Sequence, residues 1–239
     1  MAKRKSRKKQ KRVVNSLRRA RLIAALVGTV MVSACGYQVY KKPLELLTWL
    51  PFSRAKTPHQ TWASYADAFE RHETDKVPAH LLAAIAQVES SGDFLASPPW
   101  TFQFALSPLD VYRPMSSAFG LMQMTDGNFR LANRTCQKNN RWVISKDCER
   151  SWSFRWWPSH SIGLTANFLN FQVEQLGLAR LSPRLRAKAL ALTHLCGPNV
   201  VPRFLKRKNY PSRCGSHRPA KYVQKVLRYA GLFRRMKGS

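Results

Sequence analysis

An acid-free basic run followed at once by an apolar segment limits what the first forty residues can form. Residues 1–21 are a charge run that cannot pack into a core by itself. Residues 22–34 read LIAALVGTVMVSA and end in small side chains just before Cys35. This order of basic region, apolar region and small residues is typical of a secretory signal. We therefore predict that residues 43–239 are exported.

Two kinds of anchor fit this segment, and the sequence leaves both open. Val32-Ser33-Ala34-Cys35 is similar to a lipoprotein signal box, in which Cys35 is lipidated after cleavage. Alternatively, the apolar stretch runs on over residues 22–40, which is long enough to span a bilayer. The basic residues before it then keep the N-terminus in the cytoplasm. A buried core helix explains neither the flanking charge nor the small residues. Both anchors predict a periplasmic, membrane-anchored protein.

The remaining cysteines agree with export. Cys136, Cys148, Cys196 and Cys214 are even in number, and four cysteines in an oxidising compartment allow three pairings. We predict Cys136–Cys148 and Cys196–Cys214, because each pair closes a short irregular loop. The alternative is four reduced, buried thiols. The sequence has no C-x-x-C pair and no clustered histidine spacing, so it predicts no metal site and no cofactor.

The exported part divides into a stalk over residues 41–58, broken by three prolines, and one domain over residues 59–239. Helical apolar spacing dominates this domain, and no strand-like alternation stands out, so a mainly α fold is expected. The stretch 92–116 is rich in proline and aromatic residues and is expected to be a long ordered loop. The expected helices cover residues 61–72, 78–90, 126–133, 159–177, 182–195 and 219–233.

The segment 78–93, PAHLLAAIAQVESSGD, carries the first candidate for chemistry. Leu82, Ile85 and Glu89 follow one another at spacings of three and four and so share one helix face. Glu89 lies at the end of this apolar stripe, in the last turn before Gly92. Partial burial and the negative end of the helix both favour the protonated carboxyl, which a general acid requires. The alternative is a solvated surface glutamate near a helix end.

The segment 116–125, SSAFGLMQMT, carries the second candidate. Gly120 between two bulky residues indicates a close approach of backbone to backbone. Gln123 offers a donor and an acceptor, which suit sugar hydroxyls and acetamido groups. Leu121, Met122 and Met124 are equally compatible with an ordinary core.

Taken together, these segments resemble the lysozyme-like lytic transglycosylase family. The family pattern is a helix that ends in Glu-Ser, then Ser-x-x-Gly-Leu-Met-Gln, and finally a Tyr-Val-x-Lys-Val helix. The corresponding residues here are Glu89-Ser90, the run from Ser117 to Gln123, and the run from Tyr222 to Val226. The order and the helix context match over roughly residues 75–230. The resemblance implies a lysozyme-like helical domain of the goose type, with a catalytic cleft, behind a basic tail and a membrane anchor.

The resemblance also implies a reaction. Glu89 is expected to protonate the β-1,4 glycosidic oxygen between N-acetylmuramic acid and N-acetylglucosamine in peptidoglycan. The same group then accepts the proton of the muramoyl 6-hydroxyl as a 1,6-anhydro ring closes, so neither water nor a second carboxylate is needed. The resemblance implies that Ser117 orients Glu89 and that Met122 and Gln123 line the cleft. The expected substrate-binding residues are Ser90, Ser117, Gly120, Met122, Gln123, His194 and Tyr222.

One departure from the family pattern keeps alternatives open. Where the family has an Ala-Tyr-Asn turn, this chain has Thr193-His194-Leu195, so His194 stands at the usual tyrosine position. His194 is either a site residue or a core histidine. The alternatives for function are a lysozyme-type hydrolase, which requires a water and commonly a second acid such as Asp93, Asp110 or Asp126, and a non-catalytic glycan-binding module.

The charge of the chain fits a polyanionic partner. Its formal net charge is +29, and eleven of the 41 basic residues but none of the 12 acidic ones lie in residues 1–34. The exported part is therefore strongly basic too, which favours peptidoglycan and the membrane surface as partners. No helix-turn-helix, zinc-finger or RNA-recognition signature supports nucleic-acid binding, and the export signal argues against it. The sequence identifies no protein partner.

Overall fold

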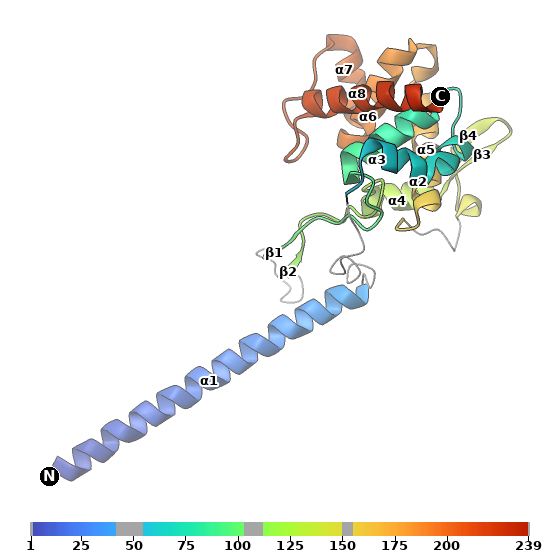
Figure 1. Cartoon of the computed structure of the whole chain (residues 1–239). Helices are drawn as coiled ribbons and strands as arrows, with labels where there is room; N and C mark the ends of the chain where they lie inside the picture. The colour runs from blue at the N-terminus through green and yellow to red at the C-terminus, as the bar shows by residue number, and fades with distance from the viewer. Residues whose placement is uncertain (1, 42–54, 103–111, 150–154, 239) are drawn as a thin grey trace. The chain divides into compact units, whose positions relative to one another are not determined.

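The computed structural model describes residues 2–41, 55–102, 112–149 and 155–238, and the chain divides into two compact units (Figure 1). One unit comprises Met1–Leu47 and Pro99–Met115, and the other comprises Thr48–Pro98 and Ser116–Ser239. Most of the expected stalk, residues 42–54, lies outside the described residues, as do residues 103–111 with Asp110.

The first unit contains one long helix and a small hairpin. Helix α1 covers Ala2–Lys41 without a break, so the basic run and the apolar stretch belong to the same helix. The part from Asn15 to Tyr37, 23 residues, is long and apolar enough to cross a membrane by length and composition. Its apolar side chains are exposed, Leu22 by 70% and Val32 by 73%, unlike those of a soluble core helix. The hairpin pairs β1, Trp100–Phe102, with β2, Tyr112–Pro114, in antiparallel register.

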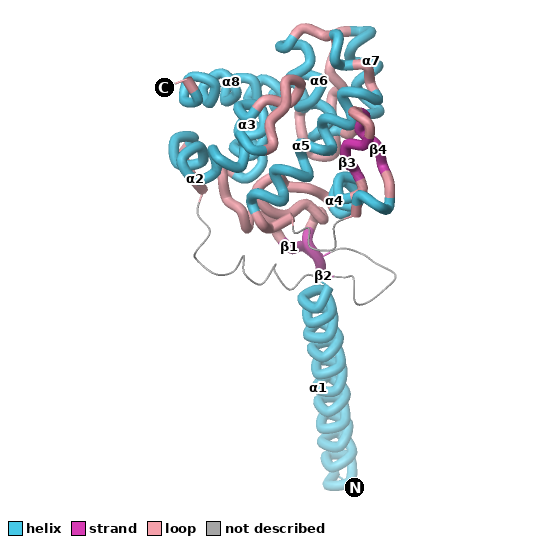
Figure 2. The backbone as a smooth tube through the Cα atoms, turned by 90° about the vertical axis from the view of Figure 1, so that its right-hand side faces the viewer, coloured by secondary structure: helices cyan, strands magenta, loops and turns pink. Residues whose placement is uncertain are grey.

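The second unit is mainly helical, as the sequence indicates (Figure 2). Its α-helices are α2 (Pro58–Arg71), α3 (Ala79–Ser90), α4 (Asp126–Asn133), α5 (Pro158–Gln175), α6 (Pro183–Cys196), α7 (Val201–Arg207) and α8 (Pro219–Lys237). Short 3₁₀ turns are η3 (Lys146–Cys148), η4 (Leu178–Arg180) and η5 (Pro198–Val200). The strands β3 (Thr135–Lys138) and β4 (Arg141–Ile144) form an antiparallel hairpin.

Helix α2 begins at a capping box that the sequence analysis missed. The Thr57 side chain accepts a hydrogen bond from the backbone of Gln60, and the Gln60 side chain accepts one from the backbone of Thr57. Pro58 follows at the first helical position, which tolerates proline. The helix therefore starts three residues before the expected Thr61, and Pro58 belongs to the domain rather than to a stalk.

Helix α3 lies at the centre of the domain, packed against α2, α8 and α5. The sequence predicts an amphipathic stripe, but the five residues from Leu82 to Ala86 are all fully buried, so the helix is enclosed on nearly every side. The buried polar Gln87 is satisfied because its amide accepts from Thr61 Oγ1 at 2.6 Å and donates to Lys56 O at 3.0 Å. Ser91 and Gly92, both with positive φ, then end the helix.

No strand-like alternation stands out in the sequence, but the described part of the second unit contains a short hairpin besides its helices. Its strands β3 and β4 lie side by side at the edge of the helices (Figures 1 and 2). Asn139 and Asn140 form the β3–β4 turn, with φ values of 50° and 60°. Two left-handed residues are what a two-residue hairpin turn requires, and asparagine tolerates that conformation. The Asn-Asn pair is the sequence signal for this hairpin.

Helices α3 and α8 run antiparallel and are joined near both ends. At one end the Tyr222 hydroxyl donates to Glu89, and at the other Lys237 donates to Glu73, next to the start of α3. The Glu73 carboxylate also accepts from Ala79 N at 3.1 Å, which caps the first turn of α3. Burial alone raises the pKa of Glu73, but the two hydrogen bonds, together with the charges of Lys237 and His80, outweigh it and hold that pKa below its ordinary value.

We expect Glu73→Gln to lower the free energy of unfolding by about 0.5–1 kcal/mol at pH 7. A carboxylate with a lowered pKa stabilises the fold above its unfolded-state pKa of about 4.3, and that contribution is lost as the pH falls through the folded-state value. The two proteins should therefore converge in stability in acid. Urea unfolding at a series of pH values measures this. Glu70→Gln, at an exposed position on α2, is the control, and a difference that persists in acid would contradict the assignment.

Candidate active site

Glu89 lies in the last turn of α3, at the open end of an otherwise buried helix. Its side chain is 17% exposed, so the carboxyl group reaches solvent although the preceding turns are in the core. Oε1 accepts a hydrogen bond from the Tyr222 hydroxyl at 2.5 Å. A carboxyl group with limited solvent access and a fixed donor is a suitable arrangement for proton transfer.

Tyr222 comes from the first turn of α8 and is paired with Glu89 across 133 residues of sequence. Burial, then the charge of Glu89 and the hydrogen bond to it, raise the pKa of Tyr222 well above 10. The phenol therefore stays protonated and keeps donating to Glu89 throughout the neutral range. Sequence analysis expected Tyr222 among the substrate-binding residues, and the structure gives it a direct contact with the candidate acid.

His194 approaches the same oxygen from the last turn of α6. Its Nε2 lies 3.5 Å from Glu89 Oε1 and 3.1 Å from Met122 O. Because a carbonyl only accepts, the contact with Met122 requires the proton on Nε2. The His194 side chain is 6% exposed. Of the two alternatives for this histidine, the structure supports a place beside Glu89, so three helices bring Glu89, His194 and Tyr222 together.

We expect Tyr222→Phe to reduce turnover of the substrate by roughly 10- to 100-fold, because a hydrogen bond to a charged group contributes about 1.5–3 kcal/mol. The raised pKa of Tyr222 means that phenol ionisation should not reduce the activity of the unaltered protein up to about pH 9. Tyr229→Phe makes the same chemical change seven residues along α8 and is the control. Steady-state rates over a pH series measure both; equal rates for the two variants would remove Tyr222 from the site.

Ser90 connects α3 to the turn around Gly120. Its hydroxyl lies 2.8 Å from Leu121 O and 2.9 Å from Ala86 O, so it bridges the helix end and the turn. The side chain is buried, which makes its role one of positioning Glu89 rather than of contacting a ligand. The two adjacent residues therefore have different surroundings: the side chain of Glu89 is partly exposed, and that of Ser90 is buried between the end of α3 and the Gly120 turn.

Gly120 confirms the predicted close approach. Its φ is 80°, and a Cβ at this position would lie 2.4 Å from the backbone oxygen of Arg155. Its N–H donates to Ala96 O at 2.8 Å, so the turn is held between two neighbouring segments. Only glycine combines this conformation with this space.

Met122 and Gln123 differ from their expected roles. The side chain of Met122 is fully buried in the core, so it does not line a cleft, and only its carbonyl faces the site, as the acceptor for His194. The Gln123 amide donates to Ala96 O at 2.7 Å and to Gly120 O at 2.9 Å. Its donors therefore hold the turn together and are not directed at a sugar.

Ser117 also has another role than the one the family pattern implies. Its hydroxyl accepts a hydrogen bond from Asp126 N at 3.0 Å, beside the start of α4. The hydroxyl therefore stabilises the loop that leads into α4, and orienting Glu89 falls instead to Tyr222, His194 and Ser90.

Arg155 is a positioning residue that sequence analysis missed. Its Nη1 donates to Ser117 O at 2.8 Å and to Met124 O at 3.2 Å, on either side of the Gly120 turn. The same nitrogen lies 2.6 Å from Asp126 Oδ1, and the side chain is 16% exposed. Nothing in the surrounding sequence distinguishes this arginine from the many others, because its role depends on the contacts made by the fold.

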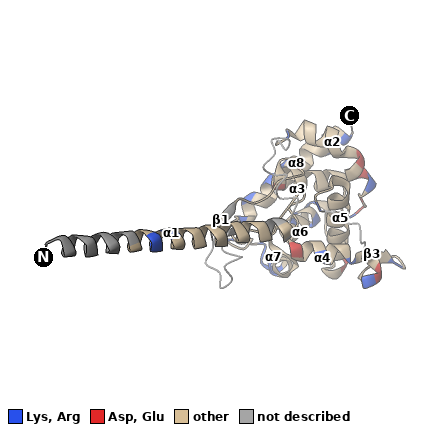
Figure 3. Cartoon of the chain, turned by 90° about the horizontal axis from the view of Figure 1, so that it is seen from below, with Lys and Arg blue, Asp and Glu red and all other residues tan. Residues whose placement is uncertain are grey.

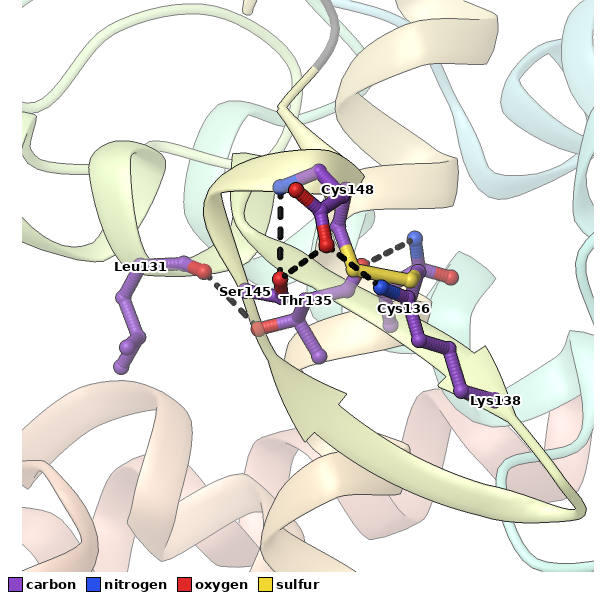
Figure 4. The surroundings of a disulfide bond; sticks show 8 residues. Leu131, Thr135, Cys136, Lys138, Ser145 and Cys148 are labelled. Atoms are coloured by element: carbon purple, nitrogen blue, oxygen red, sulfur yellow. Dashed lines mark hydrogen bonds and ion pairs between the residues drawn. A yellow bond between two sulfur atoms is a disulfide. The ribbon is translucent and has the colours of Figure 1, made fainter.

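Two disulfides secure the loops of the domain, and they are the two pairs expected from the spacing. Cys196–Cys214 joins the end of α6, two residues after His194, to the segment before α8. Cys136–Cys148 joins β3 to η3, next to the hydrogen bond from Thr135 Oγ1 to Leu131 O (Figure 4). Cys35 is not part of a disulfide. Cys196–Cys214 therefore links the end of α6, which carries His194, to the segment before α8, which carries Tyr222.

Other acidic groups near the site have structural partners. Asp93 accepts from Leu95 N at 2.8 Å, and Asp126 pairs with Arg155. Within the described ranges, His, Cys, Asp and Glu side chains form no group of three or more that could hold a metal ion. At this site the Glu89 carboxyl group therefore accepts from the Tyr222 phenol, with the His194 imidazole nitrogen 3.5 Å away.

Neither a protein-family model nor a curated protein matches the sequence. The functional assignment therefore depends on the site residues themselves.

Proposed function

We propose that this protein is a membrane-anchored peptidoglycan lytic transglycosylase with Glu89 as its single acid and base. It would belong to the carbon–oxygen lyases, and its domain would have a lysozyme-like helical fold of the goose type. The observation that carries the proposal is the environment of Glu89: a partly exposed carboxyl group at the end of a buried helix, in contact with the Tyr222 hydroxyl and close to His194. The motif order from Glu89-Ser90 to Tyr222 gives independent support.

In the proposed reaction, Glu89 donates its proton to the glycosidic oxygen as the bond from muramoyl C1 to that oxygen breaks. The positive charge that develops at C1 faces the newly formed carboxylate. Glu89 then accepts the proton of the muramoyl 6-hydroxyl while O6 forms the new bond to C1. Atoms and protons balance without water, and Glu89 returns to its starting form.

The neighbours of Glu89 suit a group that must be both acid and base. The Tyr222 hydroxyl stabilises the carboxylate that forms in the first step, because a hydrogen bond to the charged form favours that form. The Nε2–H of His194 donates to Met122 O, and this nitrogen lies 3.5 Å from the same carboxylate oxygen, where the dipole of the N–H favours the negative charge. Both groups are already in position before the reaction begins. Such preorganised stabilisation of charge is usually the largest single contribution to enzymatic rate enhancement.

The proposed location is the periplasm. The N-terminal apolar helix fits a signal anchor or a membrane span, and the two disulfides fit an oxidising compartment outside the cytoplasm. A lipid on Cys35 and an uncleaved helix remain the two proposed anchors. Intact mass of the native protein distinguishes them, because a chain that starts at Met1 cannot be lipidated at Cys35.

Identification of the reaction products tests the proposal. Purified sacculi are digested with the full chain in detergent, and the released muropeptides are analysed by mass spectrometry against sacculi incubated without protein. A lytic transglycosylase gives anhydro-muropeptides, which are lighter than hydrolysed products by one water. Fully hydrated products would assign the protein to the lysozyme-type hydrolases. Intact strands with the protein bound to them would indicate a glycan-binding module.

A further inference from the structure

A groove lies between the starts of α3 and α6 and the middle of α8. Its volume is about 720 Å³, and its polar lining consists of His80, Ser182, Arg184, Gln224, Arg228 and Arg234. The size is that of a site for a small ligand or for a few residues of a polymer. None of the residues assigned to the Glu89 site lines this groove.

The groove is positively charged. Three arginines line it and no acidic residue does. The distribution of basic and acidic residues along the ribbon is coloured in Figure 3. In the described part of the chain, none of the three guanidinium groups pairs with a carboxylate; Arg228 lies over the Tyr229 ring at 5.3 Å. Burial and then Arg234 lower the pKa of His80, so the arginines supply the charge at neutral pH. The first turn of α6 contributes a partial charge of the same sign.

An acidic residue, Glu73, lies near the groove, and its carboxylate already accepts hydrogen bonds from other groups. Glu73 is close enough to influence His80, but its carboxylate accepts hydrogen bonds from Lys237 and from Ala79 N. It therefore does not neutralise the arginines. Exposed guanidinium groups that pair with no carboxylate of the described residues are matched in geometry and charge to carboxylate or phosphate groups, which guanidinium groups bind through paired N–H donors.

The position of the groove favours one source of such groups. The groove lies at the start of α3 and Glu89 at its end, about 14 Å apart along the helix at 1.5 Å per residue. The groove and Glu89 therefore lie at opposite ends of one helix. A polymer strand is long enough to contact both places, whereas a single lipid headgroup is not, and this favours the wall polymer.

We propose that this groove binds free carboxylates of the peptides carried by a peptidoglycan strand, and so holds the strand apart from the point of cleavage. The inference rests on the proposed function for its choice of polymer. The three arginines then contribute to affinity and not to proton transfer, so their replacement weakens binding without changing the chemistry at Glu89.

The test compares two charge-matched variants in the full chain carrying Glu89→Gln, so that binding is measured without cleavage. One variant removes two groove charges, Arg184→Gln with Arg228→Gln. The other removes two charges from exposed positions around the β3–β4 hairpin, Arg141→Gln with Lys146→Gln. Sedimentation with sacculi in detergent at physiological salt gives the affinity. We expect the groove variant to bind at least about tenfold more weakly than its control.

A second arm repeats the comparison with sacculi whose carboxyl groups have been amidated. The difference between the two variants should disappear there. Equal losses for both variants on native sacculi would overturn the proposal, because net charge alone would then explain binding. A difference that survives amidation, or displacement by glycerol phosphate at lower concentration than by a carboxylate peptide, would also overturn it. If the unaltered protein releases no products while the groove variant still loses affinity, the proposed enzymatic function is wrong, but the proposed binding of carboxylates in the groove is supported.

Discussion

Replacing Glu89 by glutamine is expected to reduce release of muropeptides from sacculi by at least about 10³-fold. General acid–base catalysis contributes about 10²–10⁴-fold where a separate group performs it, and here one group performs both proton transfers. Glutamine has nearly the same shape, and its oxygen still accepts the hydrogen bond from Tyr222. The fold and the binding of glycan strands should therefore persist while the chemistry is lost. The measurement is the initial rate of product release by the full chain in detergent.

The control for this loss is Glu70→Gln, which makes the same change at an exposed position on α2. It should retain the rate of the unaltered protein within about twofold, since surface substitutions of this kind change little. Melting temperatures of both variants show whether folding is affected. A Glu89→Gln protein that keeps a tenth or more of the activity would remove Glu89 as the acid and base and direct attention to another carboxylate.

Replacing Gly120 by alanine is expected to lower the free energy of unfolding by roughly 2–5 kcal/mol. The left-handed conformation costs a residue with a Cβ about 1–2 kcal/mol, and overpacking costs about 1–3 kcal/mol more. The clash cannot be relieved by a rotating side chain, because the added carbon would lie 2.4 Å from the backbone oxygen of Arg155. Displacement of the turn also moves Leu121 O, to which Ser90 is bonded, so activity should fall as well. Urea unfolding of the full chain measures the change.

Gly127→Ala is the matched control, seven residues along the same region. A Cβ there has no atom within 4 Å, and Gly127 lies in α4 without positive φ. Its unfolding free energy should change by less than about 1 kcal/mol, since alanine suits a helix better than glycine does. Similar stability for the two alanine variants would show that the Gly120 turn can relax, against the geometry described above.

The sequence predicted the parts of the site that depend on local pattern. Periodicity located the helix that carries Glu89, and Gly120 between bulky neighbours indicated the close approach that the structure contains. The contact between Glu89 and Tyr222 joins residues 133 apart, so no local pattern of spacing predicts it. The family pattern alone brought Tyr222 into consideration, and it assigned this residue to the substrate rather than to the acid.

The errors share a physical cause. The family resemblance placed Met122 and Gln123 in a cleft, and the donor and acceptor of Gln123 suit a sugar. Burial of Met122 and the hydrogen bonds of Gln123 to backbone carbonyls decide their places instead. Arg155 was missed for the same reason, since its role consists of contacts with Ser117, Met124 and Asp126. The type of a residue indicates which contacts are available to it, and only the tertiary structure selects among them.

The order of Glu89, His194 and Tyr222 along the chain determines at which stage of folding the three side chains can come together. Glu89 is on an early helix of the domain, whereas His194 comes near the end of α6 and Tyr222 at the start of the last described helix. During synthesis, the segment with Glu89 precedes its two partners by more than a hundred residues. The contact between Glu89 and Tyr222 therefore forms only after α8 has docked against α3, and the Cys196–Cys214 disulfide links the two segments that carry His194 and Tyr222. The proposed site would thus be completed by the last described helix of the chain to be made.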